Sequence, residues 1–146
     1  MAILVDTNVL VRYADRHDPR HPIARQAVDA LRSRDSLRTA SQNLVELWNV
    51  LTRPRLQNGF GKRPEEAGSI LRTLEDLFPR MADSDDAFGH WKRLVERFQV
   101  SGVQVHDARL VAAMLCHDIS TILTFDGRDF RRYSELGIQA LDPREV

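Results

Sequence analysis

The sequence predicts an α/β protein built around a parallel sheet. Short apolar segments of strand length alternate with longer segments whose apolar residues recur at helical spacing. The first segment, AILV at 2–5, is apolar at every position, which is typical of a central strand covered on both faces. Strands that alternate with helices along a chain favour parallel pairing with right-handed crossovers.

The expected strands are short apolar segments bounded by polar residues: 2–5, 37–41, 119–125 and 138–141, with FPRMA at 78–82 as a weaker candidate. The expected helices place apolar residues three or four positions apart: 8–16, 21–34, 41–53, 64–78, 83–100 and 106–118. Pro54 ends the third helix and Pro64 begins the fourth. Asp83 or Ser84 is expected to cap the fifth. The Gly-, Pro- and Arg-rich segment 53–64 is predicted to be an exposed loop.

Composition narrows the possible functions. The chain has 146 residues, which suits a single domain spanning 1–146. It contains 21 basic and 21 acidic residues, so any nucleic-acid binding must come from a local patch. All basic residues except Lys62 and Lys92 are arginines, whose planar fork suits phosphate, although arginine richness also follows genome composition.

The single cysteine, Cys116, cannot form an internal disulfide and has no second thiol with which to build a zinc site. This favours a reducing, cytoplasmic location. The N-terminal apolar segment is too short for a signal peptide, and no segment approaches the length of a membrane span.

Four acids are placed where ligand sites of parallel sheets form. Asp6 follows the strand 2–5 directly, and Asp126 follows the strand 119–125. Glu46 and Asp107 lie near the starts of helices that follow apolar segments. Because the carboxyl ends of parallel strands meet at one edge of the sheet, the four carboxylates are expected to converge there.

Each acid also has an ordinary structural interpretation. Asp6 and Asp107 suit helix caps, and Asp126 precedes Gly127 in a dipeptide typical of turns. Glu46 lies between apolar neighbours in NLVELWNVL, so a purely solvated role suits it less well. Spacing alone leaves these alternatives open for each acid, while the four together favour a shared site.

Converging carboxylates repel one another unless protons or a cation intervene. An all-oxygen donor set suits Mg²⁺ or Mn²⁺, which lower the pKa of a bound water and polarise phosphoryl oxygens. The matching reaction is phosphodiester hydrolysis. The sequence contains no GxSxG, P-loop or GxGxxG motif. The five histidines show no ligand spacing with acids, and His106 is interpreted as a bystander.

Four segments together resemble one family. They are ILVDTNVL, SQNLVELWNVLTRP, VHDARLVAAML and ILTFDGRDF, and they occur in the order and spacing of the PIN-domain ribonucleases, most closely the VapC-like toxins of toxin–antitoxin modules. The resemblance implies a three-layer α/β/α sandwich and a metal-dependent endoribonuclease that uses a metal-activated water. It also implies an acidic metal-binding and catalytic set of Asp6, Glu46, Asp107 and Asp126. Thr7 and Asn8 resemble the polar residues that support the first acid. Either Asp126 or Asp129 suits the fourth position, and we prefer Asp126 because it stands immediately beyond the strand.

The resemblance also implies partners: an RNA substrate, a cognate antitoxin protein and a second copy of the chain in a homodimer. Candidate RNA-backbone ligands are basic residues of the 53–64 loop and of the predicted sheet edge: Arg12, Arg53, Arg55, Lys62, Arg63, Arg109 and Arg128. Apolar side chains close to Glu46 are candidates for an antitoxin groove wherever they are not part of the core: Leu47, Trp48, Leu51, Leu56 and Phe60.

Two other functions were considered. A haloacid-dehalogenase-like phosphatase also begins with a strand and an acid, but it requires a second aspartate where this chain has Asn8. A non-catalytic PIN-like binding module would be indicated by a missing acid, and all four acids are present.

Overall fold

The fold is centred on a four-stranded, fully parallel sheet. The computed structural model describes all residues from 1 to 146. The strands are β1 (Ala2–Val5), β2 (Ser36–Arg38), β3 (Thr121–Leu123) and β4 (Gln139–Leu141), in the spatial order β2–β1–β3–β4. β1 is therefore flanked by a strand on each side, as predicted from its continuous apolar character.

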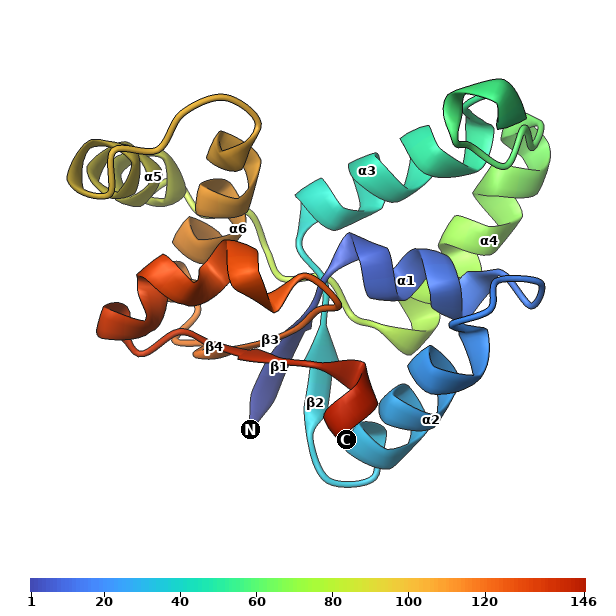
Figure 1. The fold of residues 1–146 in the computed structure, drawn as a ribbon, viewed down its shortest axis with the longest axis horizontal. Coiled ribbons are helices and arrows are strands. Elements are labelled where there is room, and N and C mark those ends of the chain that lie inside the picture. Colours follow the sequence, from blue (N-terminus) through green and yellow to red (C-terminus); the bar gives the residue numbers. More distant parts are fainter.

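Helices cover both faces of the sheet. They are α1 (Thr7–Ala14), α2 (His21–Arg32), α3 (Ser41–Thr52), α4 (Pro64–Leu77), α5 (Ala87–Arg97) and α6 (Gln104–Cys116). Three further segments are 3₁₀-helical: η1 (Arg55–Gln57), η2 (Gly127–Leu136) and η3 (Pro143–Glu145). Figure 1 shows α1 to α4 on one side of the sheet and α5, α6 and η2 on the other. The expected α/β/α sandwich is therefore confirmed.

Side-chain alternation along β1 divides the core in two. Ile3 and Val5 pack into a cluster built with α1, α2, α3 and α4. Leu4, between them, packs into a second cluster with α5, α6 and η2. Successive side chains of a strand point to opposite faces, so each layer of helices receives its own part of the strand.

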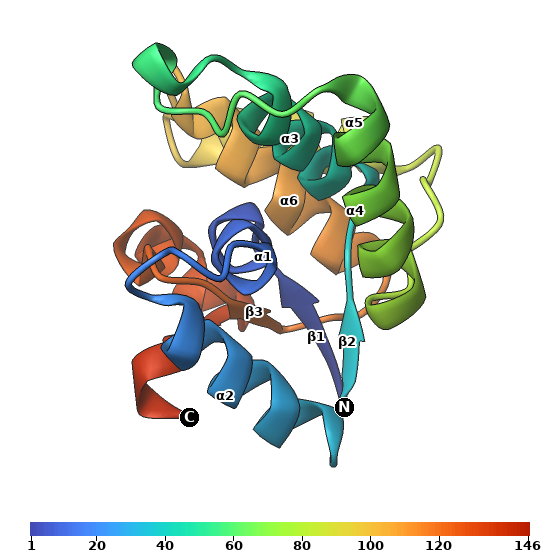
Figure 2. The same ribbon diagram turned by 90° about the vertical axis from the view of Figure 1, so that its right-hand side faces the viewer.

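All four strands end at the same edge of the sheet because they are parallel. In Figure 2 the arrowheads of β1 and β2 point the same way, toward the edge from which α1 and α3 start. Asp6 stands between β1 and α1 and caps that helix, accepting a hydrogen bond from the backbone N–H of Thr7. The cap interpretation of Asp6 is therefore correct, and it does not exclude a role in a site.

Two predictions around residues 78–86 are wrong. The FPRMA segment forms no strand of the sheet and contributes only a single bridge between Thr39 and Arg80. That bridge also explains why β2 ends at Arg38, since Thr39 pairs with the 79–81 segment and leaves β1. The fifth helix starts at Ala87 rather than at residue 83, and the hydroxyl of Ser84 accepts the N–H of Asp86 inside the preceding turn.

The strand expected at 119–125 is shorter, since β3 spans only Thr121–Leu123. The start of α6 and the segment after β3 also differ from expectation. α6 begins at Gln104, so Asp107 lies in its first turn and is not its cap. Residues 127–136 are 3₁₀-helical, although no helical spacing of apolar residues predicted this segment; Phe130 and Tyr133, three residues apart, are its buried members. That spacing matches the three-residue turn of a 3₁₀-helix. None of the helices combines the length and apolar character needed to cross a lipid bilayer.

Replacing Leu4 by Ala is expected to destabilise the protein by about 3 kcal/mol, because this fully buried side chain joins the central strand to the α5–α6 layer. Urea unfolding followed by circular dichroism measures the change. Val45→Ala is the matched control, since Val45 is 69% exposed on α3. Equal stability of the two variants would contradict this description of the core.

Candidate active site

The four predicted acids line one cavity at the carboxyl edge of the sheet. Asp6 follows β1, Asp126 lies beyond β3, Glu46 stands in the second turn of α3, and Asp107 stands in the first turn of α6. All four border a cavity of about 550 Å³, and Asp129 borders it too. The expected convergence is therefore present in the structure.

Asp6 is buried and held by three donors. Its Oδ1 accepts the backbone N–H of Thr7 at 2.8 Å. Its Oδ2 accepts the hydroxyl of Thr124 at 2.8 Å and the amide of Asn8 at 3.2 Å. Val5 is paired with Leu123 in the sheet, so the next residues, Asp6 and Thr124, lie opposite one another. The pairing of β1 with β3 thus fixes the orientation of this carboxylate.

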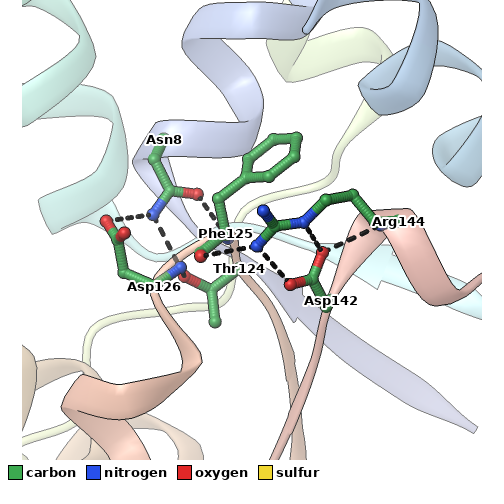
Figure 3. Close-up of polar contacts among 6 residues, drawn as sticks. All are labelled: Asn8, Thr124, Phe125, Asp126, Asp142 and Arg144. Atoms are coloured by element: carbon green, nitrogen blue, oxygen red, sulfur yellow. Dashed lines mark hydrogen bonds and ion pairs between the residues drawn. The ribbon is translucent and has the colours of Figure 1, made fainter.

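Asn8 connects the ends of the same two strands. Its Oδ1 accepts the backbone N–H of Phe125 at 3.1 Å, which sets the orientation of the amide. Its Nδ2 lies 3.0 Å from the Thr124 hydroxyl and 3.2 Å from Oδ2 of Asp126. Figure 3 shows this amide between Asp126 and Thr124. Asn8 therefore orients Asp126 as well as Asp6.

Glu46 is oriented by neutral side chains of its own helix and of α1. Its Oε2 accepts the hydroxyl of Thr7 at 2.7 Å, and its Oε1 accepts the amide of Gln42 at 2.8 Å. Asn43 is fully buried and donates to the Thr7 hydroxyl at 3.3 Å. Gln42 also donates to the backbone oxygen of His106, which links the start of α3 to the start of α6.

Burial and mutual repulsion weaken the acidity of two of these carboxyls. Burial raises the pKa of Asp6 to about 6. The hydrogen bonds from Thr124 and Thr7 act in the opposite direction and lower this pKa, whereas the negative charges of Glu46 and Asp126 raise it. Burial likewise raises the pKa of Asp107 to about 7, and the neighbouring acids add to this in the order Asp6, Asp129, Glu46 and Asp126. No basic side chain forms an ion pair with any of them, although Arg12 and Arg53 line the same cavity.

The chemical type of the ligands in the cavity suits a hard divalent cation. These ligands are carboxylate oxygens, and each oxygen that accepts one hydrogen bond retains another lone pair. In the present side-chain positions, no three acidic, histidine or cysteine side chains are grouped closely enough to hold an ion. Coordination therefore requires rotation of side chains within the cavity. Asp107 accepts no hydrogen bond and is half-buried, so it is the carboxylate least restrained against such a rotation.

The basic residues selected from the sequence are not all at this cavity. Arg12 and Arg53 line it. Arg128 lines a neighbouring polar depression that shares Asp126, and Arg63 pairs with Glu66 at the start of α4. Arg109 lines a separate, more apolar groove of about 480 Å³ between α5, α6 and the start of α3. That groove contains none of the four acids, so we place the site in the carboxylate cavity.

Three residues of the hydrogen-bond network around the acids were not predicted from the sequence: Thr124, Gln42 and Asn43. Thr124 is a fully buried polar residue directly before Phe125, and Asn43 is a fully buried amide in the first turn of α3. The only indication in the sequence was that each is a polar residue within a segment whose apolar neighbours predict burial. That indication does not identify Asp6 or Asn8 as partners of Thr124, because they lie 118 and 116 residues away along the chain.

Comparison with known proteins identifies the family. The PIN domain model matches residues 3–136, which is most of the chain. The chain therefore belongs to the PIN-domain family, as its motifs indicated, and the haloacid-dehalogenase-like alternative is wrong. Within this family it is 32% identical over 154 residues to Ribonuclease VapC48 of Mycobacterium tuberculosis, an alignment that covers 98% of both chains.

Solved structures agree at the level of the fold. VapBC-1 of nontypeable Haemophilus influenzae superposes with a TM-score of 0.71 at 14% identity, covering 98% of both chains. VapC20 of Mycobacterium tuberculosis, a toxin that cleaves the sarcin–ricin loop, superposes with a TM-score of 0.64 at 22% identity, covering 99% of this chain and 98% of that one.

The raised pKa of Asp107 predicts how pH changes stability in the presence of a chelator. The carboxyl titrates near pH 7 in the folded chain but near its ordinary 3.8 when unfolded. The stability contributed by its protonated form is present below about pH 4 and is lost as the pH rises through about 7. Asp107→Asn resembles the protonated form, so the variant should be more stable than the wild type at about pH 8, with the difference disappearing below about pH 4. Urea unfolding across this range tests it, and a wild type more stable than the variant at the upper pH would contradict the burial argument.

Proposed function

We propose that the protein is a divalent-metal-dependent endoribonuclease that acts as the toxin of a toxin–antitoxin pair. The observation that carries the proposal is the cavity in which four carboxylates from four separate elements meet without a basic partner. Such a cluster destabilises the metal-free folded chain, so its presence is explained by a bound cation. The named ribonuclease to which the chain is 32% identical supports RNA as the substrate.

In this proposal Asp6, Glu46 and Asp107 hold a Mg²⁺ or Mn²⁺ ion, and Asp126 completes the site. When bound, the ion lowers the pKa of a water and polarises a phosphoryl oxygen, so that water becomes the nucleophile in phosphodiester hydrolysis. The protein's own contribution is orientation: Thr7 and Gln42 fix both oxygens of Glu46, and Asn8 fixes Asp126. With these ligands restrained, the rotation that coordination requires falls mainly to Asp107, which accepts no hydrogen bond.

The arginines that line the cavity are the best-placed of the proposed RNA ligands. Arg12 and Arg53 border the same space as the acids, opposite a site that is otherwise anionic. Arg55, Lys62 and Arg63 belong to the 53–64 segment, of which Arg53, Asn58 and Phe60 line the cavity, and Arg128 lies beyond Asp126. Because Arg109 faces the apolar groove, it is the weakest member of the proposed set.

We further propose an antitoxin that covers apolar surface beside Glu46, in a protein that forms homodimers in the cytoplasm. Leu47 and Leu51 are fully buried and are excluded from such a surface. Leu56 is fully exposed, and Trp48 lines a shallow apolar depression between α3 and α4 together with Val45 and Leu71. An amphipathic antitoxin helix suits this surface, and an arginine from it would pair with the adjacent carboxylates.

Cleavage assays with purified protein test the proposal. The wild type should cut single-stranded RNA in Mg²⁺ or Mn²⁺ and lose this activity in a chelator. Asp6→Asn should reduce cleavage by more than about a hundredfold while the thermal unfolding temperature in chelator is retained or raised, because it removes a proposed ligand without removing volume. RNA cleavage that persists in chelator would refute metal dependence, and a wild type inactive on all RNA would refute the enzyme assignment in favour of a non-catalytic PIN-like module.

The choice of the fourth acid has its own test. Asp126→Asn should lower cleavage more than Asp129→Asn, because Asn8 orients the Asp126 carboxylate whereas no side chain donates to that of Asp129. Both residues are exposed, so neither substitution should change the folded structure. The reverse order of effects would assign the position to Asp129.

The proposed partners are tested by light scattering after size-exclusion chromatography. The protein alone should have the mass of a dimer, and the product of an adjacent small gene should bind it and stop RNA cleavage. Trp48→Ala should weaken that complex, with Phe88→Ala as a control on the exposed surface of α5. A monomer that is neither bound nor inhibited would leave the ribonuclease proposal intact and remove the toxin proposal.

A further inference from the structure

Three arginines surround the ring of Phe125. The guanidinium carbons of Arg12 and Arg20 each lie 5.3 Å from the ring centroid, and that of Arg144 lies 5.8 Å from it. Phe125 is only 6% exposed, which is consistent with cover by these side chains. A cation over an aromatic face is attracted by the ring quadrupole, so the ring is a platform on which all three charges are held.

The three arginines come from different segments: Arg12 and Arg20 are eight residues apart, and Arg144 follows Arg20 by 124 residues. Arg12 belongs to α1, Arg20 to the connection before α2, and Arg144 to η3 near the C-terminus. Figure 3 shows Arg144 extending toward Phe125 while its guanidinium donates hydrogen bonds to Asp142. Gathering like charges costs free energy, and the sequence separation shows that tertiary structure, rather than a local run of arginines, brings them together.

Only one of these charges is compensated. Arg144 forms an ion pair with Asp142, and that pairing occupies both carboxylate oxygens. Neither Arg12 nor Arg20 forms an ion pair, and Asp18 accepts only the backbone N–H of Arg20. The Nε of Arg12 is buried and has no hydrogen-bond acceptor. The Nη1 of Arg12 donates to the backbone oxygen of Asn8 at 2.9 Å. The exposed guanidinium of Arg20 makes no hydrogen bond, so the free donors of the cluster are those of Arg20, and two of its positive charges have no ion-pair partner.

The cluster adjoins the carboxylate cavity. Phe125 is followed directly by Asp126, and Arg12 itself lines the cavity with the four acids. An RNA strand whose scissile phosphate lies among the acids must place a neighbouring phosphate nearby. The arginine cluster offers that phosphate what the acids do not: positive charge and planar donor forks.

We propose that Arg12, Arg20 and Arg144, gathered around Phe125, bind a phosphate of the RNA backbone next to the cleaved bond and position the strand. The inference rests on the ribonuclease function proposed above, and it adds Arg20 and Arg144, which nothing in the sequence singled out. A phosphodiester fits better than an acidic peptide because the free donors lie beside the catalytic carboxylates, where the substrate strand must pass. Arg12 borders the cavity, whereas Arg20 and Arg144 lie outside its lining, so the cluster would hold the strand beside the cleaved bond rather than act on the reacting atoms.

Fluorescence anisotropy with a labelled oligouridylate in Mg²⁺ tests the proposal, with every protein carrying Asp6→Asn to prevent cleavage. Arg20→Met should weaken binding several-fold and reduce the slope of log affinity against log salt by about 0.7, the value for one lost contact to single-stranded phosphate. Arg20→Lys keeps the charge and should restore the slope. Arg32→Met is the matched control, an exposed arginine at the opposite end of α2, and should change neither quantity.

Cleavage kinetics without the Asp6 substitution provide the second readout. Arg20→Met should raise KM with little change in kcat, the pattern of lost substrate binding. Unchanged affinity, salt slope and KM in Arg20→Met would overturn this inference while wild-type cleavage leaves the ribonuclease function standing. If Arg20→Met lost binding to the adjacent gene's product but kept its affinity for RNA, the inference would also be overturned, and the arginine cluster would be assigned to protein docking. A wild type that neither binds nor cuts RNA would refute the underlying function itself.

Discussion

The register between β1 and β3 is the constraint on which the candidate site depends. Val5 pairs with Leu123, and the backbone N–H of Asp6 donates to the Leu123 oxygen. This places Asp6 opposite Thr124, so that a hydroxyl reaches its carboxylate. A slip of one residue would turn the side chains of one strand to the other face and separate this pair. The buried apolar side chains of both strands specify the register and so specify the site.

The site also requires both layers of helices. Glu46 comes from α3 on one side of the sheet and Asp107 from α6 on the other. Gln42 joins them, since its amide donates to Glu46 and to the backbone of His106. A change in the packing of either layer would therefore alter the distance between two proposed metal ligands. Asp6, Glu46 and Asp126 are held by neutral donors, which orient them without neutralising the charge that attracts a cation.

Opposite charges occupy adjacent but separate places at this edge of the sheet. The acids line the cavity, and Arg20 and Arg144 lie on the ring of Phe125 at its side, with Arg12 bordering both the ring and the cavity. Ion pairs between these arginines and the four acids would neutralise both the negative charge of the cavity and the positive charge beside it. The only ion pair among these arginines is that of Arg144 with Asp142. Separation keeps the cavity attractive to a cation and its margin attractive to a phosphate, which is the combination that a metal-dependent nuclease needs.

Local patterns in the sequence predicted the main elements and the positions of the acids. The continuous apolar segment before Asp6 indicated a central parallel strand, and the ends of parallel strands define one edge of the sheet. One boundary that failed is set by distant residues. β2 ends early because Thr39 pairs with the 79–81 segment, and no property of Thr39 or its neighbours encodes that partner.

By itself the sequence indicated that Asp6, Glu46, Asp107 and Asp126 come to the same edge, because the alternation of strands and helices along the chain and their apolar spacing are local properties. Only the tertiary structure decided what surrounds them. Thr124 reaches Asp6 across 118 residues and Arg144 reaches Phe125 across 19, through contacts that no local spacing records. The physical reason is that hydrogen bonds and charge clusters depend on distance in space, which packing of the apolar core sets once the whole chain has folded.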